Sequence, residues 1–303
     1  MQPTEYLTFS SDNPFTLSVA TPNWDGTMYY SLNTTEWIEW DGSEISSTTI
    51  YLRGKGNTRI TGDSGIYKWT LTGTNISCNG NIETLLDYTI VEVGEHPSMA
   101  NYCYSFMFSG CTSLTTAPTL PATTLTTYCY CYIFHNCTSL TTAPELPATT
   151  LASYCYQGMF YGCTSLTTAP ALPATTLTTY CYYYMFYGCT SLTTAPELPA
   201  TTLASSCYRN MFYNCTSLTT APELPATTLA DHCYYYMFRD CTKIKLSTTK
   251  TGKYTTAYRI PKSGTGTTAT NALGNMFTGT GGTFTGTPSI NTTYYLHSSN
   301  SVV

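Results

Sequence analysis

The stretch that decides the fold is CYYYMFYGCTSLTTAPELPATTLASS, residues 181–206, because nearly the same text stands directly before and after it. Five full copies occur, and a sixth opens and then loses the pattern. The copies begin at Cys103, Cys129, Cys155, Cys181, Cys207 and Cys233. Repeats of about 20 to 50 residues are typical of solenoids, in which each unit buries its apolar face against its neighbours. The atypical ends are expected to be caps.

The composition excludes several classes of protein. Only 10% of the 303 residues are charged and the net charge is −5, which gives no electrostatic basis for binding nucleic acid. An apolar content of 42% argues against disorder. No apolar run is long enough to cross a membrane, and residues 1–19 do not follow the pattern of a secretory signal. We therefore expect no membrane insertion.

Each copy reads as three short segments. Cys181, Met185 and Cys189 recur at every fourth position, a spacing that predicts one inward stripe of a short helix, which Gly188 would end. The next segment, residues 189–196, is rich in threonine and predicts a short strand. Prolines bound that strand, and the remaining residues return the chain to the core.

The regions outside the repeats read differently. Residues 1–86 contain short alternating or aromatic runs separated by turn residues, which predicts an antiparallel β-sandwich. Residues 87–102 would form the N-terminal cap, 103–258 the solenoid and 259–303 the C-terminal cap. The fold class is therefore an α+β repeat protein, with a β-sandwich followed by a capped solenoid of 26-residue repeats.

The repeat text resembles the BspA-like leucine-rich repeats, which follow the pattern A-F-x-x-C-x-x-L-x-x-I-x-L-P. The residues that match it in order are Met185, Phe186, Cys189, Leu192, Ala195, Leu198 and Pro199. The likeness covers about residues 103–245, and the copy departs from the family by Pro196 and by its longer period. Such repeats occur in surface proteins of gut bacteria and their phages. The resemblance implies a secreted or displayed horseshoe or solenoid that binds rather than catalyses.

The fourteen cysteines suggest chemistry, but their spacing does not. Twelve of them fall in two columns, and the two members of a copy are separated too widely for a zinc site, which uses closely spaced C-x2-4-C pairs. The remaining alternatives are disulfides and buried thiols that pack as small apolar groups. We expect reduced, buried thiols and no metal.

No catalytic or cofactor motif is present. The four histidines, His96, His135, His232 and His297, are scattered and share no partner that recurs with the repeat. The acidic segment EWIEWDGSE, residues 36–44, could hold a cation, but it lacks the EF-hand pattern and reads as a solvated hairpin. The sequence therefore predicts a non-enzymatic protein without a cofactor.

The positions that vary between copies define the candidate site. They are the two residues before the repeated Met or Ile and the residue after the repeated Phe, and they flank the inward stripe. Drift at exposed positions would explain them, and so would a tyrosine-rich binding face. The candidate ligand-binding residues are Tyr161, Tyr187, Tyr213, Tyr183, Tyr184, Tyr235, Tyr236, Arg209 and Arg239.

These observations predict an adhesion or recognition protein on a phage virion or a bacterial surface. Its partner would be a glycan or protein on a host surface, or a neighbouring virion protein. The alternative is a structural spacer or decoration protein that binds no specific ligand. A third alternative is an ice-binding array, because solenoid turns would place the repeated threonines in a lattice.

Overall fold

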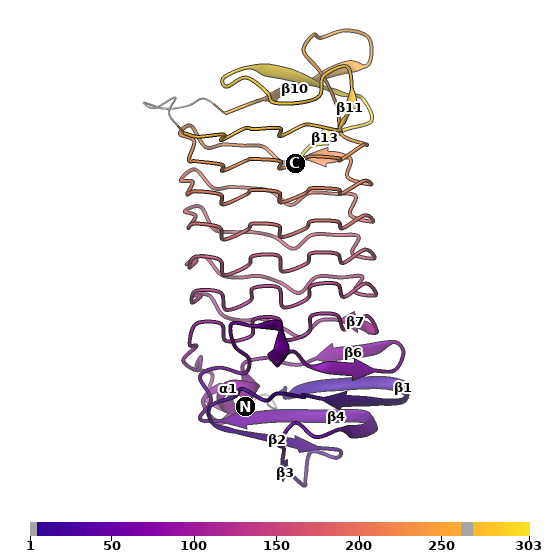
Figure 1. Cartoon of the computed structure of the whole chain (residues 1–303), viewed down its shortest axis with the longest axis vertical. Coiled ribbons are helices and arrows are strands. Elements are labelled where there is room, and N and C mark those ends of the chain that lie inside the picture. The colour runs from indigo at the N-terminus through magenta and orange to yellow at the C-terminus, as the bar shows by residue number, and fades with distance from the viewer. Residues whose placement is uncertain (1–4, 262–268) are drawn as a thin grey trace.

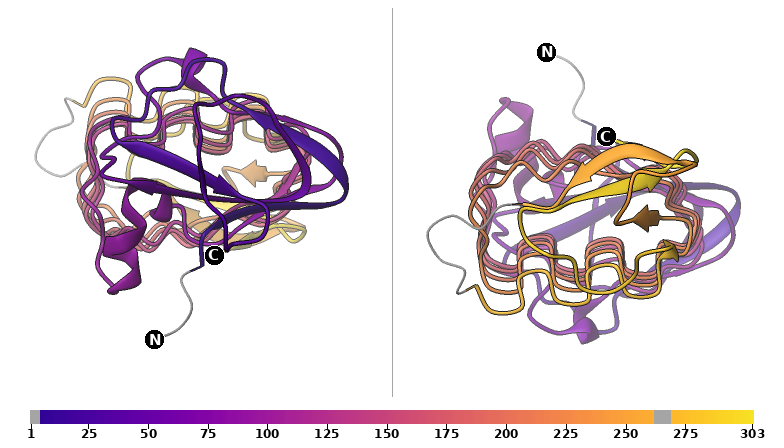
Figure 2. Two further views of the ribbon diagram at one scale, coloured as in Figure 1. Left: turned by 90° about the horizontal axis from the view of Figure 1, so that it is seen from below. Right: turned by 90° about the horizontal axis from the view of Figure 1, so that it is seen from above.

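The computed structural model describes residues 5–261 and 269–303, and within these ranges the chain forms a tall stack of turns (Figure 1). Viewed along the long axis, the turns superpose into a flattened ring (Figure 2). Regular structure is mostly β and is concentrated at the two ends. The elements are β1 Leu7–Ser18, β2 Thr27–Ser31, β3 Ile38–Glu39, β4 Ile45–Lys55, η1 Gly65–Tyr67, β5 Thr70–Thr72, β6 Ile76–Asn79, α1 Thr84–Glu92, β7 Leu114–Thr116, β8 Thr220–Ala221, β9 Lys245–Ser247, β10 Tyr254–Arg259, β11 Gly281–Gly282, β12 Thr293–His297 and β13 Ser301–Val302.

One wall of each solenoid turn consists of consecutive β-turns. The short helix predicted from Cys181, Met185 and Cys189 is therefore wrong. In the fourth copy this turn wall spans residues 180–189. Its backbone N–H groups alternate in direction: that of Tyr182 donates to Cys207 O in the next turn, whereas that of Met185 donates to Tyr182 O within the same turn. Left-handed backbone recurs every fourth residue, with φ of 57° at Tyr180, 59° at Tyr184 and 71° at Gly188. A helix cannot pass through such residues.

The opposite, threonine wall is held by few backbone bridges. Thr142, Thr168 and Thr194, which occupy the same position in successive copies, pair in parallel with one another in turn. Prolines lack the N–H that a continuous ladder needs, so the strand predicted at 189–196 is reduced to one bridged residue. Among the described residues, this wall carries strands in the first copy (β7), the fifth copy (β8) and the degenerate sixth copy (β9).

Equivalent side chains stack into ladders inside the coil. The rings of Phe160 and Phe186 lie 5.6 Å apart between centroids, and those of Tyr156 and Tyr182 lie 5.8 Å apart. All four rings are at most 1% exposed. The inward stripe predicted from Cys181, Met185 and Cys189 is buried as expected, but a tyrosine ladder that the helical interpretation missed is buried beside it.

All fourteen cysteines lie in the described residues, where they are buried free thiols. From the second copy onward, the second cysteine bridges two turns: Cys189 Sγ donates to Phe160 O at 3.1 Å and Cys215 Sγ donates to Phe186 O at 3.0 Å. A disulfide would remove this donor. The thiol therefore contributes both packing and a hydrogen bond between turns.

The N-terminal region forms one sheet, so the predicted β-sandwich is wrong. Six strands from residues 7–79 join β7 of the first repeat in a seven-stranded sheet of order β3-β2-β4-β1-β6-β7, with β5 also paired to β1. The long strand β1 bends at a register shift between Ser10 and Phe15, and β5 and β6 pair with its two halves. The N-terminal end of the coil is therefore covered by one bent sheet and not by the two sheets of the predicted sandwich.

The sheet and the repeats share one core. β6 pairs in parallel with β7, Trp69 N donates to Met107 O at 2.8 Å, and the rings of Phe9 and Phe108 lie 6.0 Å apart. The single α-helix in the described residues, α1, packs along β4 beside this junction.

The C-terminal end is closed by a second sheet of order β10-β12-β9-β11. β13 adds one rung to the threonine wall, because it pairs in parallel with β8. Tyr258 Oη donates to Pro222 O at 3.0 Å and fastens β10 to that wall. Residues 262–268 of the predicted C-terminal cap lie outside the described residues.

Candidate functional site

Three predicted tyrosines form one stacked row on the outside of the turn wall. The rings of Tyr161 and Tyr187 lie 4.4 Å apart with planes 7° apart, and those of Tyr187 and Tyr213 lie 4.7 Å apart with planes 19° apart. Each ring is partly exposed. Because their faces cover one another, the row presents ring edges and hydroxyl groups to solvent.

Two arginines are held among the tyrosine rings. The guanidinium of Arg239 lies 5.5 Å from the centroid of Tyr213 and 4.7 Å from that of Tyr236. That of Arg209 lies between Tyr183 and Tyr235, at 5.5 and 5.1 Å. Cation–π contacts of this kind hold the guanidinium groups in place, and Nε of both arginines is buried.

The remaining tyrosines connect these contacts into one network. The ring of Tyr184 packs edge-on against Tyr161 at 6.0 Å and Tyr187 at 5.4 Å, and it lies 3.9 Å from Tyr183. Tyr235 and Tyr236 are paired in the same way at 4.0 Å. The structure thus brings all nine predicted residues together, and this set is called the tyrosine face: Tyr161, Tyr183, Tyr184, Tyr187, Arg209, Tyr213, Tyr235, Tyr236 and Arg239.

A second tyrosine row escaped the sequence interpretation. Tyr102, Tyr128, Tyr154 and Tyr180 stack at centroid distances of 4.7, 4.4 and 4.7 Å. Tyr180 packs edge-on against Tyr183 at 5.3 Å, so this row adjoins the tyrosine face. The sequence does indicate this row, because a Tyr precedes the first Cys in four copies. The sequence interpretation missed it because it considered only the positions that vary between copies.

The tyrosine face carries two arginines, and an acid lies beside it, because Asp240 Oδ2 is 3.6 Å from Arg239 Nε. Burial, with a smaller effect of the neighbouring Tyr187, raises the pKa of Tyr161. Burial and the hydrogen bond to Tyr184 raise the pKa of Tyr183. The phenols of Tyr161 and Tyr183 therefore stay protonated near neutral pH, where each can donate and accept a hydrogen bond.

A comparison with protein families identifies the repeat. The model described as "BspA type Leucine rich repeat region" matches residues 92–218 and 156–258, in six copies, and together these cover more than half of the chain. The chain belongs to this family. The BspA-type protein has no match among curated proteins, and no solved structure matches it.

Membership of this family indicates a general type of function. BspA-type repeats are commonly involved in adhesion and protein interaction, are often surface-associated and are generally non-enzymatic. In the described part of the BspA-type protein, no helix is long and apolar enough to span a membrane. No group of three or more His, Cys, Asp or Glu residues that could hold a metal occurs there either.

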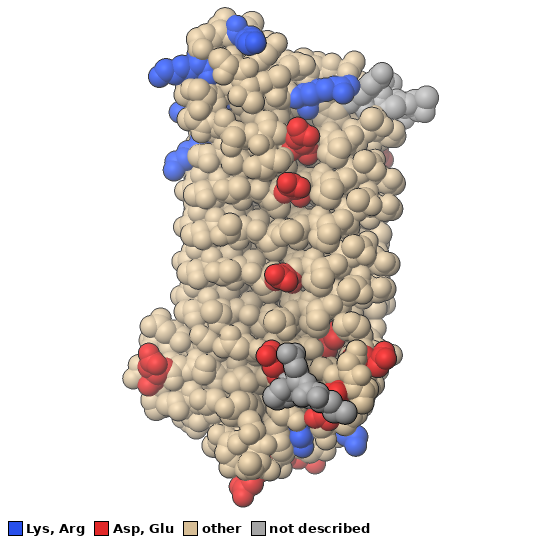
Figure 3. Space-filling model, turned by 180° about the vertical axis from the view of Figure 1, so that it is seen from behind, with Lys and Arg blue, Asp and Glu red and all other residues tan. Residues whose placement is uncertain are grey.

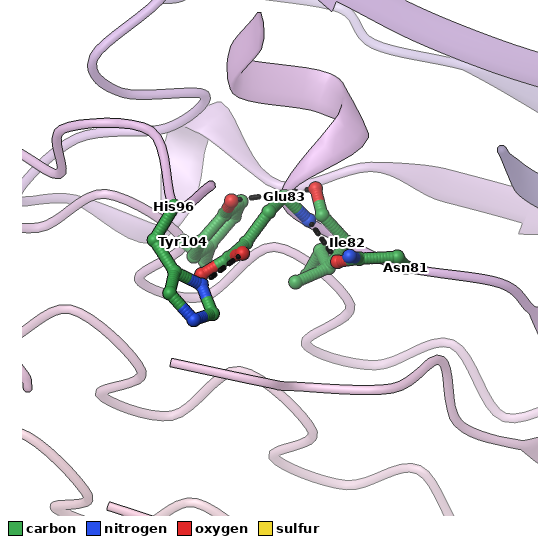
Figure 4. Close-up of polar contacts among 5 residues, drawn as sticks. All are labelled: Asn81, Ile82, Glu83, His96 and Tyr104. Carbon is green, nitrogen blue, oxygen red and sulfur yellow. Dashed lines mark hydrogen bonds and ion pairs between the residues drawn. The ribbon is translucent and has the colours of Figure 1, made fainter. Parts of the chain in front are cut away.

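One acid outside the tyrosine face is buried. Glu83, which is 2% exposed at the start of α1, shares a hydrogen bond of 2.7 Å with His96 Nδ1 (Figure 4). Burial raises the pKa of Glu83, and His96 opposes that effect. Asn81 Oδ1 accepts from Glu83 N, and Tyr104 Oη donates to Ile82 O, so the cluster joins the first turn to α1. This histidine partner was not predicted, and its role here is structural.

Proposed function

We propose that this protein is a non-enzymatic recognition protein that binds a partner protein through the tyrosine face. The observation that carries the proposal is the connected network of seven tyrosines and two arginines on a fixed backbone. Tyrosine and arginine dominate the energetic centres of protein interfaces, because they supply contact area and hydrogen bonds at low cost in entropy.

The stacking of Tyr161 on Tyr187 bears on the class of partner. Sugars commonly bind to the free face of an aromatic ring, and within this row the ring faces are covered by one another. Ring edges, hydroxyls and guanidinium N–H groups remain, and these suit the polar groups of a protein surface. A glycan that binds through its hydroxyl groups is the second candidate.

The place of action is a virion or bacterial surface, where BspA-like repeats are typical. The competing function is a spacer or decoration protein, for which the tyrosine network would only stabilise the coil. An ice-binding role has less support, because threonine hydroxyls on the threonine wall donate to the preceding turn: Thr219 Oγ1 lies 3.1 Å from Thr193 O.

Two variants of the stacked row test the proposal. Replacing Tyr161, Tyr187 and Tyr213 by Phe removes the hydroxyls and keeps the rings, whereas replacing them by Ser removes both. The control replaces the exposed Thr142, Thr168 and Thr194 by Ser. Binding to bacterial envelope preparations and to purified virions is measured for each folded variant.

The Phe variant should bind at least about tenfold more weakly than the parent protein, because each interface hydrogen bond contributes roughly 1 kcal/mol. The Ser variant should not bind. The threonine variant should bind like the parent protein. Full binding by a folded Ser variant would refute the tyrosine face, and loss in the threonine variant alone would place the site on the opposite wall.

A further inference from the structure

Charge is distributed very unevenly along this molecule. Residues 1–102 hold twelve of the 17 Asp and Glu residues and four of the 12 Lys and Arg residues, a net charge of −8. Residues 231–303 hold seven Lys and Arg against two Asp and Glu, a net charge of +5. The two regions lie at opposite ends of the stack, as Figure 3 shows. The molecule is therefore a rod with an acidic and a basic end.

The acidic end finishes in a free sheet edge. β3 is the outermost strand of its sheet and pairs only with β2, and Ile38 within it is 53% exposed. Around it lies the acidic segment 36–44, whose Glu36, Glu39 and Glu44 are exposed and have no ion pair within the described residues. The segment is held in place, because Trp37 packs 4.1 Å from the guanidinium of Arg53.

The basic end also finishes in a free sheet edge. β10 is the outermost strand of the C-terminal sheet, where it pairs with β12, and its first residue, Tyr254, also forms a bridge with Thr251. Residues 255–257 in its centre are exposed. Lys250, Lys253 and Arg259 flank it, are exposed, and form no ion pair in the part of the chain that is described.

A free strand edge invites pairing with another edge, and flanking charge decides which one. Two β10 edges repel each other because both are basic, and two β3 edges repel because both are acidic. Only the opposite ends of two molecules attract. When identical chains contact one another through two different surfaces that face in opposite directions, each new chain leaves a free surface for the next. Such contacts form linear assemblies and do not close into a ring.

We propose that the acidic segment 36–44 of one molecule docks on β10 of a second copy, so that the protein associates head to tail. Lys250, Lys253 and Arg259 pair with Glu36, Glu39 and Glu44, and the two free edges align. Exposed ion pairs are individually weak and are screened by salt, so the contact is reversible and depends on ionic strength. The tyrosine face remains free along the side of the rod.

Charge reversal tests this contact on the full chain. One variant carries Glu36→Lys, Glu39→Lys and Glu44→Lys, the other Lys250→Glu, Lys253→Glu and Arg259→Glu, and a third carries all six changes. Light scattering and sedimentation velocity give the average mass at low salt and at about 0.5 M salt, where the Debye length falls to roughly 4 Å. Melting curves establish that each variant is folded.

The parent protein should exceed its monomer mass of 33.3 kDa at low salt and return to it at high salt. Each triple variant alone should stay monomeric, whereas an equimolar mixture of the two, and the six-fold variant, should associate again. A parent protein that is monomeric at low salt up to about 1 mM, or a mixture that does not associate, would overturn the proposal. So would association that survives in either triple variant.

A control separates this inference from the proposed function. The variant with Tyr161, Tyr187 and Tyr213 replaced by Ser should retain salt-dependent association while losing its partner. If that variant becomes monomeric at low salt, the contact runs through the tyrosine face and the head-to-tail assignment is wrong.

Discussion

Tyr161 and Tyr187 stack more closely on the outside of the coil than Phe160 and Phe186 stack inside it, with centroid distances of 4.4 and 5.6 Å. The partners in each pair occupy the same position in successive copies of the repeat. A partly exposed row with such close contacts stabilises the stacking of turns in addition to any role in binding. The energy of the row can be separated from its recognition function.

A double-mutant cycle measures that energy. Tyr161→Ala and Tyr187→Ala should each lower the free energy of unfolding, and the double variant should lose less than the sum by about 0.5 to 1.5 kcal/mol, the usual contribution of an aromatic pair. Urea denaturation gives the four values. Strict additivity would mean that the two rings stack without stabilising the fold.

Two glycines in equivalent positions should respond differently to substitution by alanine. Gly162 and Gly188 both have φ of 71°, so Ala costs about 1 to 2 kcal/mol of backbone strain at either position. A Cβ at Gly162 would also overlap Asn136 Oδ1, whereas at Gly188 the nearest atom is 3.9 Å away. Gly162→Ala should therefore destabilise the protein more than Gly188→Ala in denaturant titrations. Equal losses would show that Asn136 moves aside at no cost.

The position occupied by Gly162 and Gly188 shows how much of the turn wall could be predicted from the sequence. Asn136 and Asn214 stand at this position in other copies and share the positive φ of Gly188, but the sequence interpretation took the position only as the end of a helix. The spacing of Cys181, Met185 and Cys189 identified the buried side. This spacing could not exclude a helix. Consecutive β-turns with a left-handed residue at every fourth position bring side chains to the same side at nearly the spacing of a helix.

The candidate site was accessible to sequence reasoning because the repeat fixes which residues become neighbours. Equivalent positions of successive copies must stack, so Tyr161, Tyr187 and Tyr213 could be placed in one row. The orientation of the rings could not be predicted, since it depends on contacts such as those of Tyr184 with two turns. The single N-terminal sheet was missed because β6 pairs with β7, a partner outside the region interpreted as a sandwich.

The buried tyrosine ladder contains a hydroxyl that should be unfavourable. Tyr182 Oη is buried and has no hydrogen-bond partner within the described residues, whereas Tyr104 Oη donates to Ile82 O at 3.3 Å. Tyr182→Phe should raise the free energy of unfolding by about 1 kcal/mol, and Tyr104→Phe should lower it by a similar amount. Chemical denaturation of the two variants measures both. A loss of stability in Tyr182→Phe would indicate a bound water at that hydroxyl.

Buried thiols should be protected from reagents until the protein unfolds. Burial raises the pKa of Cys181 to about 12, so almost no thiolate forms at pH 8. A thiol reagent should therefore label the folded protein very slowly and should count fourteen free thiols in denaturant without reductant. Recovery of far fewer thiols in freshly purified protein would mean that disulfides form in place of the hydrogen bonds between turns.

The same burial predicts a loss of stability at alkaline pH. Burial raises the pKa of Cys163 from 9.0 to about 12, and Cys189 shifts in the same direction. Between these values the unfolded chain has released protons that the folded chain still holds, so the free energy of unfolding falls as pH rises, by up to about 1.4 kcal/mol per group and pH unit. This contribution is fully present below pH 8 and is lost progressively from pH 9 towards pH 12.

Serine at these two positions offers a matched comparison. A double variant with Cys163→Ser and Cys189→Ser keeps a hydroxyl that can donate to the preceding turn, and this group does not titrate in the range. Urea midpoints from pH 7 to pH 11 should fall less steeply for this variant than for the parent protein, although its stability at pH 7 is lower. Parallel curves would show that both thiols are already accessible to hydroxide in the folded state, and that the turns open locally around them.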